Sequence, residues 1–125
     1  MKIIIAGSRD LFEYEILCKF MNKIEKKYEV THVISGRSKG MDSCGELWAV
    51  EHGKEIIDMP ADWSLGKKAG PLRNIEMLKV ADIILVIMND NSKGSSHMSK
   101  IAIESGKPTY VYNFTQKKGN KYNVK

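Results

Sequence analysis

The chain has 125 residues, of which 42% are hydrophobic and 28% are charged. This length allows one domain with one core, and the composition is that of a globular protein rather than a disordered one. The formal net charge of +5 suits anionic ligands in general but is too small to indicate a nucleic-acid partner. No apolar run approaches the ~20 residues that cross a bilayer, so no membrane partner is expected.

The start of the chain predicts a buried strand rather than a signal peptide, because the apolar stretch in Met1–Gly7 is too short for one. We therefore expect a cytoplasmic protein. Cys18 and Cys44 are far apart and form no CxxC pair, so neither a disulfide framework nor a metal site is expected. Cys44 shares a helical face with Met41 and Trp48, which favours a buried packing thiol.

Strand and helix patterns alternate along the chain. Apolar, β-branched runs predict strands at residues 2–6, 31–34, 55–59, 83–88 and 107–113. Apolar residues at helical spacing predict helices over Leu17–Tyr28 (with Asp10 as N-cap), Met41–Ala49, Leu72–Ala81 and Met98–Ser105.

This alternation predicts an α/β fold, a single Rossmann-like three-layer domain with a parallel five-stranded sheet in the order 3-2-1-4-5. The domain is expected to span residues 1–115. Residues 116–125 are rich in lysine, and we expect them to form a basic, solvated and partly disordered tail.

Three glycine-bearing loops each follow a predicted strand and precede a helical segment: Gly7–Arg9, Ser35–Asp42 and Asn89–Ser96. In the predicted strand order, the first and third of these loops flank the switch point of the sheet, and the second opens onto the same rim. Backbone N–H groups at such loops bind phosphate groups. The sequence therefore predicts a phosphate-binding site of the kind that holds nucleotides.

Each loop offers its own ligand groups. Gly7 lets the backbone approach a ligand, Ser8 adds a hydroxyl, and Arg9 offers a bidentate fork for a phosphate. Asp42 falls in the first turn of a predicted helix. It either caps that helix, because its charge is favourable to the helix dipole, or accepts hydrogen bonds from ribose hydroxyls, and capping is slightly favoured. The remaining predicted phosphate ligands of the second and third loops are Ser35, Gly36, Arg37, Gly40, Gly94, Ser95 and Ser96.

The irregular segment before the third helix adds further candidates. Asp62 and Trp63 lie in it, and Trp63 either stacks on a base or anchors the loop over the sheet edge. Arg73 and Asn74 begin the third helix, from where they can reach ligand oxygens. The alternative for Arg73 is an exposed ion pair with Glu76.

With these residues assembled, the chain resembles the GSR-motif branch of the SLOG superfamily. These small bacterial and phage Rossmann-like proteins are related to the "lonely guy" phosphoribohydrolases, the DprA DNA-processing proteins and the molybdenum-cofactor carrier proteins. The resemblance rests on four ordered motifs: IAGSR at 5–9, SGRSKGMD at 35–42, the segment from PADW to PLRN at 60–74, and SKGSSHM at 92–98. It implies a nucleotide or nucleotide-derived ligand, such as an ADP-ribose-like molecule, and implies no other cofactor.

Two departures from the family pattern concern the ligand and catalysis. Arg37 replaces a second glycine, which makes the rim more cationic. The phosphoribohydrolase relatives use a glutamate after the fourth strand together with an arginine. Arg73 matches that arginine, whereas Met98 stands at the position of the glutamate and cannot act as a general base. We therefore expect binding without turnover, and the weak catalytic candidates are Arg73, Asp42 and Glu76.

The leading prediction is thus a protein that binds a small-molecule nucleotide. The first alternative is a nucleotide N-glycosidase or phosphoribohydrolase, and the second is DprA-like binding of single-stranded DNA. Only Trp63 offers a stacking aromatic and no basic stripe is evident, so nucleic acid is not expected. His97 has no evident partner and is predicted to lie on a helix surface. The sequence leaves the oligomeric state open, a homo-oligomer included.

Overall fold

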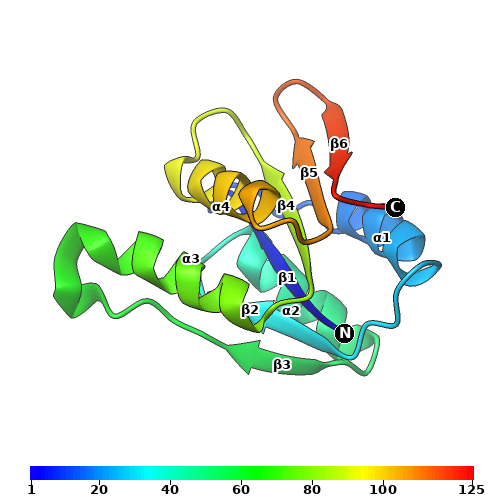
Figure 1. The fold of residues 1–125 in the computed structure, drawn as a ribbon, viewed down its shortest axis with the longest axis horizontal. Helices are drawn as coiled ribbons and strands as arrows, with labels where there is room; N and C mark the ends of the chain where they lie inside the picture. The colour runs from blue at the N-terminus through cyan, green and yellow to red at the C-terminus, as the bar shows by residue number, and fades with distance from the viewer.

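The computed structural model describes residues 1–125 and gathers all strands into one sheet (Figure 1). The strands are β1 (Lys2–Gly7), β2 (His32–Ser35), β3 (Glu55–Asp58), β4 (Ile83–Met88), β5 (Thr109–Asn113) and β6 (Lys118–Tyr122). The helices are α1 (Tyr14–Glu25), α2 (Met41–Glu51), α3 (Ala69–Val80) and α4 (Lys93–Glu104), and a short 3₁₀ helix, η1 (Trp63–Lys68), precedes α3.

The strand order is β3-β2-β1-β4-β5-β6. The first five strands are parallel to their neighbours, and β6 runs antiparallel to β5. The predicted α/β fold and the order of the first five strands are therefore confirmed. Strands β2 and β3 are added on one side of β1, and β4 and β5 on the other. The carboxyl ends of β1 and β4 therefore form the switch point of the sheet.

Helices cover both faces of the sheet and give the predicted three layers. On one face, Leu17 of α1 and Trp48 of α2 belong to a core cluster with Ile3 of β1. On the other face, Met77 of α3 belongs to a second cluster with Ile4. Adjacent residues of β1 thus feed opposite cores, as the alternation of side chains along a strand requires. Cys44 is fully buried in the first cluster, as predicted for a packing thiol.

The sixth strand corrects the prediction of a five-stranded sheet with a partly disordered tail. Lys118–Tyr122 pairs antiparallel with β5, and the side-chain amide of Asn123 donates to the carbonyls of Ile103 and Lys107 at 3.0 and 3.1 Å. The sheet therefore extends beyond residue 115. The sequence of β6, KGNKY, lacks β-branched residues, so pairing with β5 rather than local preference makes it a strand.

Two predicted helix starts are wrong. The N-cap of α1 is Glu13 instead of Asp10, whose carboxylate accepts a hydrogen bond from the side chain of Asn89 at 2.8 Å. Helix α4 begins more than a turn before Met98, with Ser92 as its N-cap. At both helix starts, the capping and hydrogen-bonding roles of the polar loop residues cannot be predicted from the spacing of apolar residues.

The buried stripe of α3 also differs from the prediction. Leu72 and Ile75 are 46% and 40% exposed, whereas Asn74 and Met77 are buried. Figure 1 shows the cause: η1 and the N-terminal end of α3 extend beyond the edge of the strands, so only one narrow side of this helix meets the rest of the molecule. None of the helices has the length and apolar character needed to span a bilayer.

Candidate functional site

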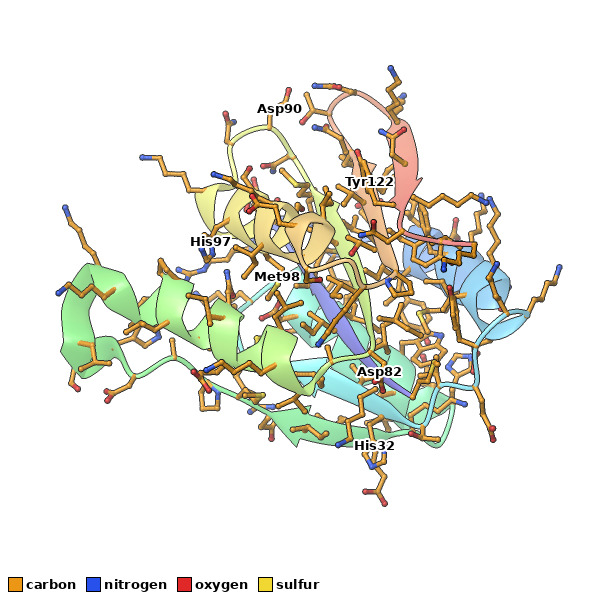
Figure 2. The ribbon with its side chains drawn as sticks, in the orientation of Figure 1. His32, Asp82, Asp90, His97, Met98 and Tyr122 are labelled. Atoms are coloured by element: carbon orange, nitrogen blue, oxygen red, sulfur yellow. The ribbon has the colours of Figure 1, made fainter.

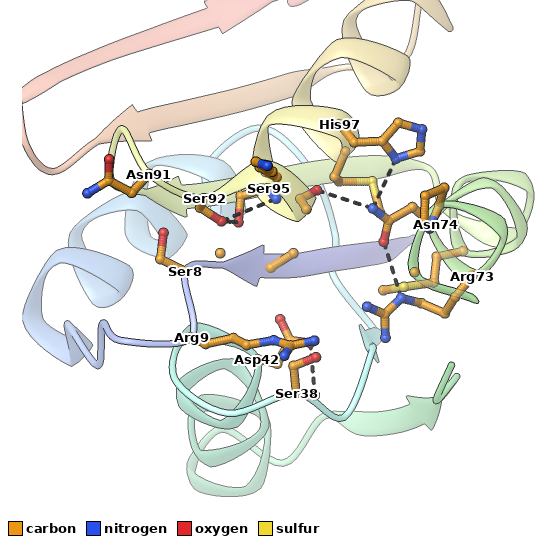
Figure 3. Close-up of a pocket in the computed structure, with 18 of the residues that line it drawn as sticks. Ser8, Arg9, Ser38, Asp42, Arg73, Asn74, Asn91, Ser92, Ser95 and His97 are labelled. Atoms are coloured by element: carbon orange, nitrogen blue, oxygen red, sulfur yellow. Dashed lines mark hydrogen bonds between the residues drawn. The ribbon is translucent and has the colours of Figure 1, made fainter. Parts of the chain in front are cut away.

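A cavity of about 570 Å³ lies at the carboxyl ends of β1 and β4, at the switch point of the sheet (Figure 3). This volume is within the range of roughly 300–1,000 Å³ that small-molecule pockets have. Its walls come from the loops after β1 and β4, the start of α2, the η1–α3 segment and the start of α4. The predicted site residues that line it are Gly7, Ser8, Arg9, Asp42, Trp63, Arg73, Asn74, Gly94 and Ser95.

Three predicted ligand residues lie outside the cavity and have other partners. The hydroxyl of buried Ser35 donates to Glu46 at 2.6 Å, and the guanidinium of Arg37 forms an ion pair with the same carboxylate at 2.5 Å. Asp62 caps η1 by accepting from the backbone N–H of Ser64 at 3.2 Å. These polar groups are engaged in local structure.

Ser96 is exposed on α4 and does not line the cavity either. Glu76, a weak catalytic candidate, pairs with Lys79 at 3.0 Å on the exposed side of α3, outside the cavity. Arg73 does not form the alternative ion pair with Glu76, because its guanidinium turns toward the loop after β2.

Two glycines shape the rim without lining the cavity. Gly40 has a φ of +74°, and a Cβ there would collide with the carbonyl oxygens of Ser8 and Arg9. Only glycine tolerates both the dihedral angle and this close approach. A Cβ on Gly36 would collide with the guanidinium of Arg73, so this glycine makes room for a side chain.

The loops after β1 and β4 are bonded to each other. Ser8 is buried, its backbone N–H donates to the carbonyl of Ile87 at 3.1 Å, and its hydroxyl oxygen accepts from the backbone N–H of Asn89 at 2.9 Å. Two of the three glycine loops are therefore held together as one unit. The hydroxyl oxygen of Ser8 thus holds the two loops together by accepting a hydrogen bond, and the hydroxyl proton is free to donate toward the cavity.

The N-terminus of α4 opens into the cavity. Ser92 accepts from the backbone N–H of Ser95 at 3.3 Å and donates its own hydroxyl proton to the Ser95 hydroxyl at 2.7 Å (Figure 3). Ser92 is thus the N-cap of α4. The first N–H groups of a helix have no partner within it, and the helix dipole makes this end positive. Lys93 and Gly94, which carry these first N–H groups, line the cavity.

A chain of hydrogen bonds links α3 to both neighbouring loops. Arg73 donates from Nη1 to the carbonyl of Gly36 at 2.5 Å and from Nε to the side-chain oxygen of Asn74 at 3.2 Å. The amide nitrogen of Asn74 donates to the carbonyl of Gly94 and to Nδ1 of His97, each at 3.2 Å. His97 therefore faces α3, as Figure 2 shows; it is half-buried on α4, and its partner is the Asn74 amide rather than a Ser, Cys or carboxylate side chain.

Two charges of opposite sign face each other near the rim. Burial raises the pKa of the Asp42 carboxyl above its usual value, although the N–H of Ser38 and the Arg73 guanidinium oppose the shift. Burial lowers the pKa of Arg73, with Asp42 opposing and Arg9 adding to the effect. An arginine remains protonated at neutral pH even so. Asp42 lies in the first turn of α2, where its charge is favourable to the helix dipole, and it also fastens the loop before α2 by accepting from the backbone N–H of Ser38 at 3.2 Å.

Trp63 lines the cavity and is more than half exposed. The guanidinium carbon of Arg9 lies 5.5 Å from the centroid of that ring, a cation–π distance. One ring face is thus covered by a cation that itself lines the cavity.

Several lining residues were missed in the sequence. Asn89 and Asn91 directly follow the fourth strand, so their place after a parallel strand is a signal that points to the site. His97 and Met98 stand in the motif at 92–98 that carries the resemblance, but residue type alone gives neither of them a role as a ligand. The lining residues not predicted as ligands are Ala6, Asp10, Ser38, Lys67, Gly70, Pro71, Met77, Asn89, Asn91, Ser92, Lys93, His97 and Met98.

The cavity is cationic, and its acid–base groups are Asp10, Asp42 and His97. Arg9, Lys67, Arg73 and Lys93 line it together with two carboxylates, Asp10 and Asp42. Met98, which the resemblance matches to the hydrolytic glutamate of the phosphoribohydrolases, is buried in the second core cluster and also lines the cavity. No group of three or more His, Cys, Asp or Glu side chains is arranged to hold a metal ion.

A model of the YspA, cpYpsA-related SLOG family matches residues 1–66 of the chain, which contain the first two glycine loops and Trp63. The chain belongs to this SLOG family. The gene 61 protein of Mycobacterium phage D29 is 37% identical to it over 92 residues, which cover 68% of this chain and 72% of the phage protein. No solved structure is significantly similar. Membership of the SLOG family suggests a nucleotide-related ligand in general terms.

Proposed function

We propose that this SLOG protein binds a nucleotide or a nucleotide-derived molecule of the ADP-ribose type in the cavity at the switch point, and does not turn it over. The observation that carries the proposal is that cations from three elements line the same cavity as the open N-terminus of α4. Arg9 comes from the loop after β1, Arg73 from α3 and Lys93 from α4 itself.

The phosphate groups bind at the start of α4 in this proposal. Free N–H groups and the positive end of the helix dipole favour an anion there, and Gly94 presents no side chain to obstruct it. A Cβ added to Gly94 would meet nothing within 4 Å, so the space beside its backbone is open. Arg9 and Arg73 supply charge-assisted hydrogen bonds from the opposite wall.

The base or second nucleoside lies toward Trp63. One face of its indole ring is covered by Arg9, and a planar base stacks either on the other face or in place of the guanidinium. Asp42 is the carboxylate placed to accept from ribose hydroxyls. Ser35, Gly36, Arg37, Gly40, Asp62 and Ser96, which lie outside the cavity, then shape the site without touching the ligand.

Absence of turnover rests on the chemistry of the lining residues. Cleavage of an N-glycosidic bond needs a carboxylate near the anomeric carbon and a general acid or base in reach of the leaving group or water. Met98 provides neither, and Glu76 is bonded to Lys79 outside the cavity. The alternative activity, a nucleotide N-glycosidase, would have to rely on Asp10, Asp42 or His97. Each of these side chains already has a partner: Asn89 for Asp10, the backbone N–H of Ser38 for Asp42 and Asn74 for His97.

Titration calorimetry with adenosine, AMP, ADP and ADP-ribose tests the proposal. We expect at least one phosphorylated compound to bind and adenosine to bind at least tenfold more weakly, because only the phosphate engages the α4 terminus. Fluorescence offers a second readout, since Trp48 is buried and Trp63 is exposed beside the cavity. Equal affinity for adenosine and AMP, or no binding of any of the four, would contradict it.

A further inference from the structure

The net positive charge of the chain is concentrated on two segments that lie near its opposite ends. Residues 14–27 and 116–125 together hold eight lysines and only two glutamates, which is more than the whole formal net charge of +5. The rest of the molecule is therefore close to neutral. All eight side chains are exposed: Lys19, Lys23, Lys26, Lys27, Lys117, Lys118, Lys121 and Lys125.

The fold brings these two segments together. Strand β6 and the C-terminus lie beside α1 in Figure 1. Gly119 of β6 is close to Phe20 of α1, since a Cβ added to Gly119 would lie 3.3 Å from the Phe20 ring. Lys121 pairs with Tyr110 of β5, and paired residues of antiparallel strands point to the same side of the sheet. Because Tyr110 belongs to the core cluster that includes α1, Lys121 also lies on the α1 side. On α1, Lys23 lies 6.0 Å from the Phe20 ring. We call the surface formed by these two adjacent lysine-rich segments the lysine face; Lys118 alternates with Gly119 and Lys121 along β6 and therefore extends from the other side of that strand.

Two lysines of α1 share one side of the helix, and two more follow its end. Lys19 and Lys23 are four residues apart in α1, Lys26 is the C-cap, and Lys27 lies just beyond it. No basic stripe is evident in the sequence, because the second half of the surface comes from the C-terminal strand.

The charges of the lysine face are not neutralised within the protein. None of the eight lysines has a carboxylate within 4.0 Å, whereas Lys54 and Lys79 elsewhere do. The carboxylate of Glu25, which belongs to α1, is itself taken by Lys54 at 3.0 Å. The positive potential of this face is therefore open to an external polyanion.

We propose that the lysine face binds the phosphate backbone of double-stranded nucleic acid without reading its sequence. None of its lysines lines the nucleotide cavity, so the two sites are separate. A duplex presents one negative charge per about 1.7 Å of its axis, and lysines act as point charges toward such a row of phosphates. Neutralising these phosphates releases the counterions that the duplex holds.

The surroundings of the lysines favour a duplex over a single strand. Single-strand binders offer exposed aromatic rings on which bases stack. Here Phe20 is half-buried, packs against Tyr112 with ring centroids 5.7 Å apart, and has Lys23 above it. Phe20 therefore offers little ring surface to a base.

The surroundings also argue against an anionic membrane. A membrane-binding surface adds large apolar side chains that enter the lipid to its cationic ones. The exposed large hydrophobic residues of this protein include Phe12, Trp63 and Leu72, but none lies on the helical turns or the strand that carry the eight lysines. Contact through charge alone suits a phosphate backbone.

Fluorescence anisotropy with the full chain and labelled 20-base-pair DNA and RNA duplexes tests this proposal. We expect binding at 50 mM salt that weakens steeply by 200 mM. If three to five lysines reach phosphates, log K falls against log salt with a slope of roughly −3 to −5. A single-stranded 20-mer and vesicles containing phosphatidylserine serve as the competing partners, and we expect both to bind more weakly than the duplexes.

The decisive variant combines Lys23→Glu with Lys121→Glu, one residue from each segment. The matched control combines Lys68→Glu with Lys100→Glu, which makes the same change in net charge at exposed lysines elsewhere. We expect at least a tenfold loss of duplex affinity in the first and less than a threefold loss in the control.

A second variant, Lys23→Gln with Lys121→Gln, keeps the test valid if the double glutamate variant folds poorly, and its melting temperature is measured to check folding. We expect it to reduce the salt slope by about 2.

Several results would overturn the proposal. Equal losses in the lysine-face and control variants would mean that only net charge matters. Tighter binding of the single strand, or binding of vesicles but of neither duplex, would assign the face to another partner. No duplex binding at 50 mM salt would leave the lysines as a solvated surface.

Discussion

The guanidinium of Arg73 donates to the backbone carbonyl of Gly36 across 2.5 Å, and so bonds the start of α3 to the loop after β2. The partner is a neutral carbonyl, so this bond orients Arg73 without cancelling its charge. Asp42 is the carboxylate that offsets that charge, while Arg9 adds to it. The cavity rim therefore keeps a surplus of positive charge that is fixed in position.

Substituting Gly36 by valine should remove Arg73 from its place while the fold survives. The new side chain would collide with the end of the flexible Arg73 side chain, and its Cβ would lie 2.9 Å from a carboxylate oxygen of Asp42. The φ angle of Gly36 is not positive, so the strain comes from contact rather than from the backbone. We expect a melting temperature close to wild type and loss of AMP binding; wild-type affinity would show that Arg73 is not needed.

Gly40→Ala provides the contrast. Its Cβ would meet backbone carbonyls that cannot move aside, and the residue has a φ of +74°. Such conformations cost non-glycine residues on the order of 1–3 kcal/mol. We expect chemical denaturation to report a loss of stability of about this size, in addition to weakened binding. A Gly40→Ala variant as stable as wild type would contradict the close approach of this loop to Ser8 and Arg9.

Arg73→Ala should weaken the binding of phosphorylated ligands by roughly 1.5–3 kcal/mol, the contribution of hydrogen bonds to charged groups. This corresponds to a roughly 10- to 100-fold higher Kd in calorimetry. The matched control is Arg37→Ala, which removes the same charge outside the cavity, where Arg37 pairs with Glu46. Equal effects of the two substitutions would point to net charge instead of a specific contact.

Asp42→Asn should stabilise the protein at neutral pH. Burial raises the pKa of this carboxyl in the folded state, so its ionisation lowers stability as the pH rises from the usual value of 3.8 through the raised one. Asparagine cannot ionise, so its advantage in melting temperature should be largest at about pH 7–8 and should shrink toward about pH 4. Glu104→Gln, at an exposed carboxylate, is the control. A lower melting temperature for Asp42→Asn at neutral pH would contradict the sign of the shift.

The protein should leave AMP, other nucleoside monophosphates and ADP-ribose intact over hours at micromolar concentration. Met98 supplies no acid–base group, and the carboxylates of the cavity are limited to Asp10 and Asp42. Chromatography for free base and ribose 5-phosphate measures this directly. Release of base by the unmodified protein, lost in the Arg73→Ala variant, would replace the binding function by an N-glycosidase.

Truncation after residue 115 should destabilise the domain. It removes β6 and the two hydrogen bonds of Asn123 to the carbonyls of Ile103 and Lys107. At about 0.5–1.5 kcal/mol for each bond, the side-chain part alone amounts to ~1–3 kcal/mol. Denaturant unfolding of the truncated chain measures the loss. An unchanged free energy of unfolding would support a domain that ends at residue 115.

The sequence by itself determined the architecture of the first five strands. Continuous apolar runs such as Ile83–Met88 are long enough, and buried enough on both faces, that only a central parallel strand suits them. The alternation with helices then restricts the topology. Gly7 and Gly40 were also identified from the sequence, because each stands between a predicted strand and the helix that follows it. The structure explains both glycines, since a Cβ at either position would collide with neighbouring atoms.

Only the tertiary structure decided how the polar residues divide between ligand site and scaffold. Ser35 and Arg37 have the residue types of phosphate ligands, yet both bind Glu46, which lies on the neighbouring helix α2. Asn74 and His97 face each other because α3 packs beside α4. Likewise, α1 and β6 form one lysine face because β6 pairs with β5 beside that helix. Contacts between segments far apart in the chain depend on packing and strand pairing, and local residue preferences carry no record of them.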